Sequence, residues 1–238
     1  MLRTLIFYAL TPLVTIVASS IALIGGRALG DRIGNFAQRL WAHGTLIPAG
    51  VKIEADLSAL DPAQTYVFMA NHQSNFDISV TTAALNRWSV RMVAKESLFK
   101  IPLFGPAMRR VGHVSVDRAK SRKAMQAIQE AVDIANSGIS MVIFPEGTRG
   151  TDLSRIGEFK IGGFILALKT GLPVAPIVIT GTGDITPKGG LRIRPGTVRV
   201  KALPPVDPCR YSLKEREKFK EDLHTAMNAA YLEMRNGG

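Results

Sequence analysis

Beyond Gly50, short strand-like runs alternate with helical stretches, and this alternation restricts the possible folds more than any other feature. Seven runs are predicted as strands, at residues 51–55, 65–70, 90–94, 113–117, 141–144, 174–180 and 197–203. Helices are predicted at residues 76–86, 119–137, 159–170 and about 213–234. Apolar strands separated by helices indicate an α/β fold, with a mainly parallel central sheet covered by helices on both faces.

The N-terminal region differs from this pattern. Residues 4–26 carry no charged side chain over 23 positions, and as a helix they would extend ~35 Å, enough to cross a bilayer core. This length favours a retained membrane anchor over a cleaved signal peptide. Residues 33–47 predict a second helix on the membrane surface, with Trp41 at interfacial depth. More Lys and Arg follow the apolar run than precede it, which predicts a body on the cytoplasmic side. A membrane-spanning anchor and one embedded in a single leaflet both stay open.

The net charge of +11 lies mostly beyond residue 60, so the body itself is basic. A basic body suits anionic lipid surfaces, phosphorylated substrates or nucleic acid. Nucleic acid is disfavoured, because aromatic residues are only 7% of the chain and no Lys/Arg-rich block has interleaved aromatics. The single Cys209 excludes an internal disulfide, and no Cys or His pair has metal-ligand spacing, so we expect no metal site.

Two short blocks carry the candidate chemistry. In the first, His72 follows the strand predicted at 65–70, and Asp77 stands five residues later. A carboxylate that accepts a hydrogen bond from one imidazole nitrogen raises the basicity of the ring and leaves the other nitrogen to take a proton. The chain has no Gly-x-Ser-x-Gly nucleophile elbow, which disfavours a lipid hydrolase. We therefore expect His72 to activate a substrate hydroxyl directly.

The second block is Phe-Pro-Glu-Gly-Thr-Arg at 144–149, which follows a predicted buried strand. Gly147 permits backbone angles that other residues resist, and Arg149 can bind a phosphate through two hydrogen bonds. Thr148 adds a hydroxyl donor. For Glu146 we expect a role in organising the loop, by pairing with a neighbouring arginine.

These blocks resemble motifs of the glycerolipid acyltransferases, specifically the bacterial 1-acylglycerol-3-phosphate acyltransferases. Residues 71–77 are similar to the Asn-His-x-Ser-x-x-Asp motif, and residues 144–149 match the third motif letter for letter. Residues 112–118 resemble the second motif, which ends in Asp-Arg, and residues 172–177 resemble the fourth. All four occur in the family's order. His113 and Ala175 depart from the family pattern, and we read both as tolerated.

The resemblance implies transfer of a fatty acyl group from acyl-CoA or acyl carrier protein to the 2-hydroxyl of a lysophosphatidate. It makes His72 the general base and Asp77 its orienting partner. It assigns the acceptor phosphate to Arg118 and Arg149, with Lys95 assisting. The reaction needs no cofactor or metal. Backbone N–H groups near the His72 turn are possible donors to the oxyanion of the reaction.

The same resemblance, with the apolar segment, predicts a membrane-anchoring segment at 1–48 and a catalytic domain at 49–238. The predicted location is the cytoplasmic face of a bacterial inner membrane, with membrane lipids as partners. Three alternatives stay open: the same chemistry on glycerol 3-phosphate, on another lysolipid, or a membrane lipid-binding protein without catalytic activity.

Overall fold

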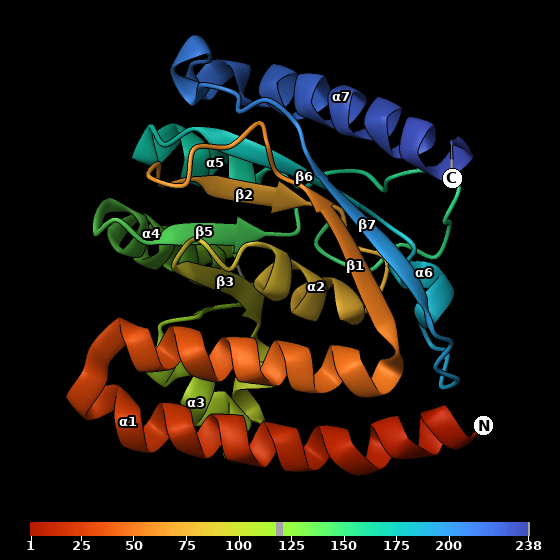
Figure 1. The fold of residues 1–238 in the computed structure, drawn as a ribbon. Coiled ribbons are helices and arrows are strands. Elements are labelled where there is room, and N and C mark those ends of the chain that lie inside the picture. The colour runs from red at the N-terminus through yellow and green to blue at the C-terminus, as the bar shows by residue number, and fades with distance from the viewer. Residues whose placement is uncertain (118–120, 238) are drawn as a thin grey trace.

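A seven-stranded sheet forms the centre of the protein, as a computed structural model covering residues 1–117 and 121–237 shows (Figure 1). The strands are β1 (Val51–Asp56), β2 (Val67–Ala70), β3 (Val90–Lys95), β4 (Val114–Val116), β5 (Ser140–Ile143), β6 (Val174–Thr180) and β7 (Gly196–Ala202). Their order in the sheet is β1-β7-β6-β2-β5-β3-β4. Neighbouring strands pair in parallel except β6 with β7, which are antiparallel. The mainly parallel α/β fold and all seven predicted strands are confirmed.

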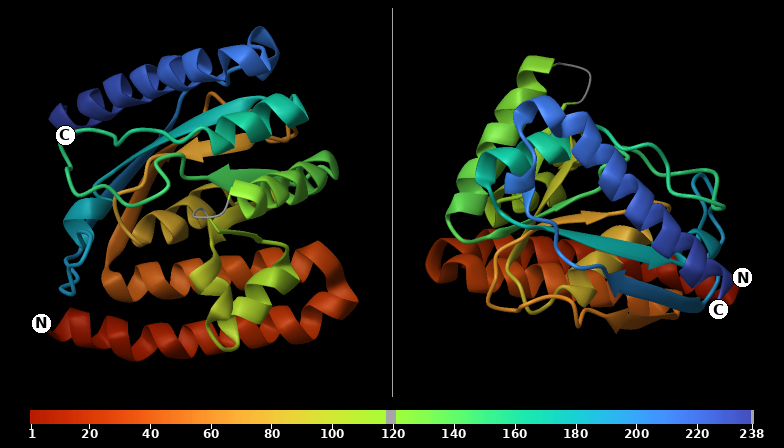
Figure 2. Two further views of the ribbon diagram at one scale, coloured as in Figure 1. Left: turned by 180° about the vertical axis from the view of Figure 1, so that it is seen from behind. Right: turned by 90° about the horizontal axis from the view of Figure 1, so that it is seen from above.

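Helices cover both faces of this sheet (Figure 2). Beside α1 (Leu2–Ala49), they are α2 (Phe76–Ala84), α3 (Phe104–Val111), α4 (Ser121–Asn136), α5 (Gly162–Thr170), α6 (Thr182–Ile185), α7 (Arg216–Asn236) and the 3₁₀ helices η1 (Glu96–Lys100), η2 (Pro208–Arg210) and η3 (Leu213–Glu215). Helices α4, α5 and α7 pack on one face, and α2 and α1 lie on the other. The four predicted helices are confirmed, whereas the short helices α3, α6, η1 and η2 were not predicted.

Strand β2 shows why the strands read as continuous apolar runs. Val67 and Met69 point into the core under α4, α5 and α7, while Phe68 and Ala70 point into the core under α2 and α1. All four residues are buried. A strand with helices on both faces buries every side chain, so its sequence shows no alternation.

Helix α1 folds back on itself, so that two antiparallel arms lie side by side beneath the body (Figure 1). We call residues 2–25 the first arm and residues 33–49 the second arm. Near the open end, Arg3 Nη1 donates to the carbonyl of Pro48 at 3.3 Å. Midway along, Trp41 Nε1 donates to Thr15 Oγ1 at 3.1 Å. These contacts fix the arms to one another along their length.

The two arms have different surroundings. The first arm is apolar and mostly uncovered: Leu2–Gly25 has a mean hydropathy of 2.0 with 17% of its most apolar window buried, which is long and apolar enough to cross a membrane. The second arm contributes Ala42, Leu46 and Ala49 to the core on the α2 side of the sheet. Trp41 turns inward against Phe104, with ring centroids 6.0 Å apart. The second arm is therefore packed against the body, and the interfacial depth of Trp41 stays a prediction.

Candidate active site

The two sequence blocks meet because their strands are neighbours. Strands β2 and β5 pair in parallel and end at Ala70 and Ile143, so the segments that follow them leave the same edge of the sheet. The rings of His72 and Phe144 stack there, with centroids 4.3 Å apart and an interplanar angle of 25°. The tertiary structure thus closes a separation of about seventy residues, as the sequence predicted.

His72 and Asp77 form a hydrogen-bonded pair. His72 Nδ1 lies 2.8 Å from Asp77 Oδ2, and the aspartate side chain is fully buried while 15% of the histidine side chain is exposed. The same Oδ2 also accepts the backbone N–H groups of Gln73 at 2.6 Å and Ser74 at 2.8 Å. The carboxylate holds the proton on Nδ1 and leaves Nε2 as the basic nitrogen of the ring.

The backbone of this turn is already used. The N–H of His72 donates to Glu146 Oε1 at 2.8 Å, and those of Gln73 and Ser74 donate to Asp77. These three groups are therefore not free to stabilise an oxyanion, which narrows the possible donors near the His72 turn. Donors to an oxyanion must come from other groups around the cavity.

Glu146 supports the turn from behind. Its carboxylate is buried, with 5% of the residue exposed, and it accepts backbone N–H groups from His72 and Gly157. Burial raises the pKa of Glu146 to about 7, and the nearby charge of Asp77 acts in the same direction. We expected an arginine partner for Glu146, but the contacts found among the described residues are with the backbone.

A cavity of about 700 Å³ opens beside the pair, between α1, α2, β3, η1 and α3. Its polar end is lined by residues from both sequence blocks and from β3, namely His72, Lys95, Gly147, Thr148 and Arg149. Much of the remaining wall is apolar and includes Phe7, Ala18, Ala22, Ala37, Phe76, Met108 and Val111. Asp77 and Glu146 stand behind this wall. Arg118, the other predicted phosphate ligand, lies outside the described residues.

The other residues of the first block anchor the turn to the fold. The side chain of Asn71 donates to the carbonyl of Ile179 at 2.9 Å and accepts the N–H of the same residue at 2.7 Å. Ser74 Oγ donates to the carbonyl of Thr186 at 2.7 Å. Asn71 thus joins the end of β2 to β6, and Ser74 joins the turn to the segment after α6.

Two residues beyond the sequence blocks also reach the site. Lys188 Nζ donates to the carbonyl of Arg149 at 3.0 Å and lies 3.5 Å from Thr148 Oγ1. It stands in a Pro-Lys-Gly-Gly segment, which carries no motif that could have revealed it. The exposed lysine thus brings a further positive charge next to Thr148 and Arg149, which line the cavity.

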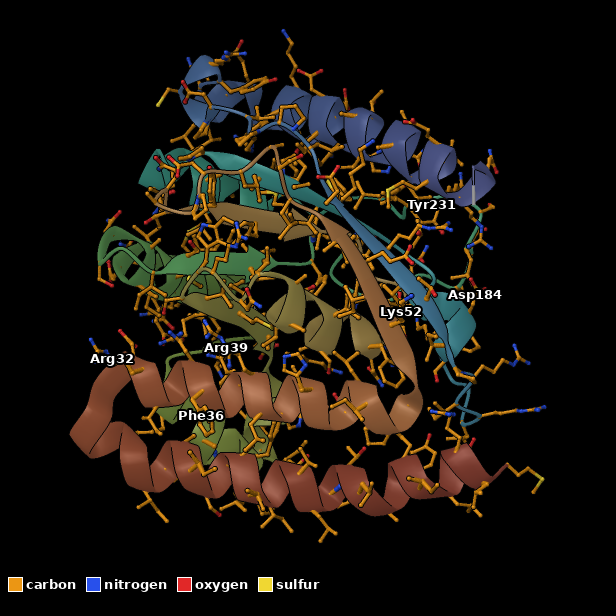
Figure 3. The ribbon with its side chains drawn as sticks, in the orientation of Figure 1. Arg32, Phe36, Arg39, Lys52, Asp184 and Tyr231 are labelled. Atoms are coloured by element: carbon orange, nitrogen blue, oxygen red, sulfur yellow. The ribbon has the colours of Figure 1, made fainter. Side chains whose placement is uncertain are left out.

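The second such residue is Tyr231, which lies on α7 near α6 (Figure 3). It is fully buried, and its hydroxyl accepts a hydrogen bond from Gln73 Nε2 at 2.6 Å and donates to the carbonyl of Leu153 at 2.7 Å. Tyr231 therefore links the C-terminal helix to the residue next to His72. In the sequence it read only as one apolar position of a helix.

His113, the departure noted in the second block, lines the same cavity. Its Nδ1 accepts the backbone N–H of Met92 at 3.0 Å. Burial lowers the pKa of His113 to about 3, and the positive charge of Arg91 adds to this effect. Arg91 is itself buried, with its guanidinium paired to Asp31. The fold accommodates His113 as a neutral, hydrogen-bonded ring.

Comparisons with known proteins agree with this geometry. The family model for acyltransferases matches residues 52–180. A chloroplastic 1-acyl-sn-glycerol-3-phosphate acyltransferase of Brassica napus is 35% identical over 195 residues, which make up 80% of this chain and 56% of that protein. A 1-acyl-sn-glycerol-3-phosphate acyltransferase of Salmonella typhimurium is 35% identical over 197 residues, covering 80% of this chain and 78% of that protein.

A solved structure is similar over almost the whole chain. The crystal structure of the 1-acyl-sn-glycerophosphate acyltransferase PlsC of Thermotoga maritima has a TM-score of 0.81 at 26% identity, covering 98% of this chain and 95% of that one. This chain spans about half the length of the plant and algal relatives that it matches.

Proposed function

We propose, from the premise that this chain belongs to the acyltransferase family, that it is a 1-acyl-sn-glycerol-3-phosphate acyltransferase. It transfers a fatty acyl group from acyl-CoA or acyl carrier protein to the 2-hydroxyl of the acceptor, giving phosphatidic acid. The observation that carries the proposal is the His72–Asp77 pair at 2.8 Å, at the polar end of a cavity that Arg149 also lines. A base and an anion-binding side chain thus face one space.

The reaction begins when His72 Nε2 takes the proton of the acceptor's 2-hydroxyl. The hydroxyl oxygen then forms a bond to the thioester carbonyl carbon, and the carbon–sulfur bond breaks as the tetrahedral intermediate collapses. The proton on Nε2 passes to the departing thiolate. Asp77 stabilises the imidazolium between these steps, and a positioned base of this kind contributes roughly 10²–10⁴-fold to the rate.

The charges at the polar end of the cavity select the acceptor. Arg149 can hold a phosphate through two parallel hydrogen bonds, and Lys95 adds a second cation. Arg118 completes the proposed phosphate site through the second sequence block. The apolar wall provides room for a fatty acyl chain, because apolar pockets bury such chains without leaving polar groups unpaired.

The first arm supports the membrane association that we propose. It exposes a row of large apolar side chains, including Leu2, Leu5, Leu13, Ile16 and Val17. Because the second arm is packed into the body and the first arm lies along it, the first arm lies lengthwise in one leaflet in our proposal. The membrane is a bacterial inner membrane and the body faces the cytoplasm, where acyl-CoA and acyl carrier protein occur.

The test is acyl transfer by the detergent-solubilised protein. Free thiol released from oleoyl-CoA is measured with and without 1-acylglycerol 3-phosphate, and the lipid product is identified by mass. We expect acceptor-dependent turnover that falls at least ~10²-fold in His72→Ala. A matched control is His43→Ala, because His43 is exposed and lies outside the cavity wall.

A rate of thiol release that changes neither with the acceptor nor with the His72 substitution would contradict the mechanism. Turnover with glycerol 3-phosphate or another lysolipid instead would keep the chemistry and change the acceptor. Parallel assays with acyl carrier protein as donor decide between the two donors.

A further inference from the structure

The connection between α6 and β7 reaches the N-terminal end of α1 (Figures 1 and 2). We call its residues 188–194 the basic loop. Tyr8 on the first arm donates its hydroxyl to the carbonyl of Leu191 at 3.0 Å. Thr4 Oγ1 accepts the N–H of Ile193 at 3.1 Å. The basic loop is therefore held against the arm that carries the exposed apolar residues.

The basic loop combines an exposed apolar side chain with exposed cations. Leu191 is 75% exposed, while Ile193 is buried against the fold. Lys188, Arg192 and Arg194 are all exposed. An apolar side chain between cationic ones, beside an apolar helix, is the composition that binds an interface of anionic lipids.

The same loop touches the candidate active site at its other end. Lys188 Nζ donates to the carbonyl of Arg149, which lines the polar end of the cavity. Over seven residues the chain thus runs from the phosphate-binding end of the cavity to the side of the membrane arm. A lipid whose headgroup is bound by this loop would have its phosphate next to the site.

We propose that the basic loop is a second membrane contact, separate from the first arm, which binds a surface of anionic phospholipids. Leu191 inserts among the lipids, and Arg192 and Arg194 bind lipid phosphates. The inference rests on the proposed membrane association and does not require the acyltransferase activity. The basic loop then fixes the rotation of the body about the first arm and holds the polar end of the cavity toward the headgroups.

The experiment places a fluorophore on the loop and measures its depth. Leu191→Cys, in a Cys209→Ser background, is labelled with an environment-sensitive dye, and the full chain is reconstituted into vesicles. Lipids carrying a nitroxide near the headgroup act as quenchers. The reference is the same dye at Lys214→Cys, an exposed position before α7, which lies on the side of the body opposite α1 (Figure 1).

We expect strong quenching at position 191 and little at position 214. The quenching at 191 should increase when phosphatidylglycerol replaces part of the phosphatidylcholine. With Arg192→Ala and Arg194→Ala together, the inserted fraction should fall by up to about fivefold for each charge removed. Lys214→Ala with Lys218→Ala removes the same charge from an exposed region and should leave quenching at 191 unchanged.

Equal quenching at 191 and 214 overturns the proposal, and so does insertion at 191 that ignores lipid charge. A third contrary result is an equal effect of the two charge-removing pairs, because it would show a general effect of net charge. None of these readouts needs turnover. A failure of this inference is therefore distinguishable from a failure of the proposed reaction, which the thiol-release assay detects.

Discussion

Two histidines line the same cavity, and their hydrogen bonds run in opposite directions. His72 Nδ1 donates to the buried carboxylate of Asp77. His113 Nδ1 accepts the backbone N–H of Met92 and lies near the positive charge of Arg91. A carboxylate thus faces the ring of His72, whereas burial and the positive charge of Arg91 lower the pKa of His113. The proton-handling role thus depends on the partner of each ring, since both rings border the same space.

The charged groups around the two histidines also differ. At the His72 end, Asp77 and Glu146 bring acidic groups behind the wall, and Arg149 stands in front. At the His113 end, a pKa of about 3 keeps the ring neutral throughout the physiological range. We therefore expect one base in the cavity, and the following substitutions test this contrast.

The largest effect is expected when the partner of His72 is altered. Asp77→Asn removes the charge that stabilises the imidazolium, so kcat should fall by ~10²-fold or more. Steady-state kinetics with 1-acylglycerol 3-phosphate measure it, and thermal unfolding shows whether the variant stays folded. A kcat within about threefold of wild type would show that the carboxylate has no part in the mechanism. The partner of each ring would then not explain a difference in proton transfer between the two histidines.

A smaller loss is expected from the ring that stacks on His72. Phe144→Leu keeps an apolar side chain but removes a stacking contact of about 0.5–1.5 kcal/mol, so kcat should fall by roughly three- to tenfold. The matched control is Phe68→Leu, because Phe68 is fully buried in β2 and makes tilted and edge-to-face ring contacts with Tyr66 and Trp88 instead. An equal loss of kcat in both variants would assign the effect to general destabilisation.

Glu146→Gln keeps an acceptor for the backbone and should hold turnover within about threefold of wild type. The pKa of Glu146 is about 7 in the folded protein, against an ordinary value of 4.5, so the folded state holds the extra proton between these values. Its contribution to stability is complete below about pH 4.5 and is lost as the pH rises to about 7. Melting temperatures of the wild type and of Glu146→Gln, measured from about pH 4.5 to about pH 7, test this pH dependence. Parallel curves would contradict the raised pKa.

The smallest effect on turnover is expected at the other histidine. His113→Asn can still accept the N–H of Met92, so activity should stay within about twofold. Stability should change in its pH dependence. Folding lowers the pKa of His113 from 6.5 to about 3, so the neutral ring contributes to the stability of the wild type above pH 6.5. This stability is lost as the pH drops from 6.5 to about 3, and His113→Asn should not show the loss. Denaturant unfolding at several pH values measures the difference. A collapse of turnover in His113→Asn would break the comparison.

Much of the fold could be predicted because its signals are local. The strand at 174–180 was visible as an apolar run, the one at 197–203 as an alternation of apolar and charged residues, and the helix near 213–234 as a long helical segment. The two blocks at 71–77 and 144–149 could be placed together because strands of a parallel sheet end at one edge. Arg118 was also predicted from its block, and its position stays a prediction.

Other features depended on partners that lie far away in the chain. The hydrogen bond from Trp41 to Thr15 joins the two arms, and it exists only because α1 folds back. Glu146 was assigned an arginine, yet the N–H groups of His72 and Gly157 occupy its oxygens. The sequence alone could not choose among these partners, because an arginine side chain and a backbone N–H group can both donate hydrogen bonds to a carboxylate.

The sequence by itself determined the α/β fold, the family, and the two residue blocks at which the site is built, because hydrophobic periodicity and short motifs are properties of adjacent residues. The tertiary structure alone decided which arm of α1 is packed into the core. It also decided that His113 stays neutral, and that Lys188 and Tyr231 contact residues of the two blocks. The hydrogen bonds of His113, Lys188 and Tyr231 join residues 21 to 158 positions apart, and such partners exist only once the chain has packed.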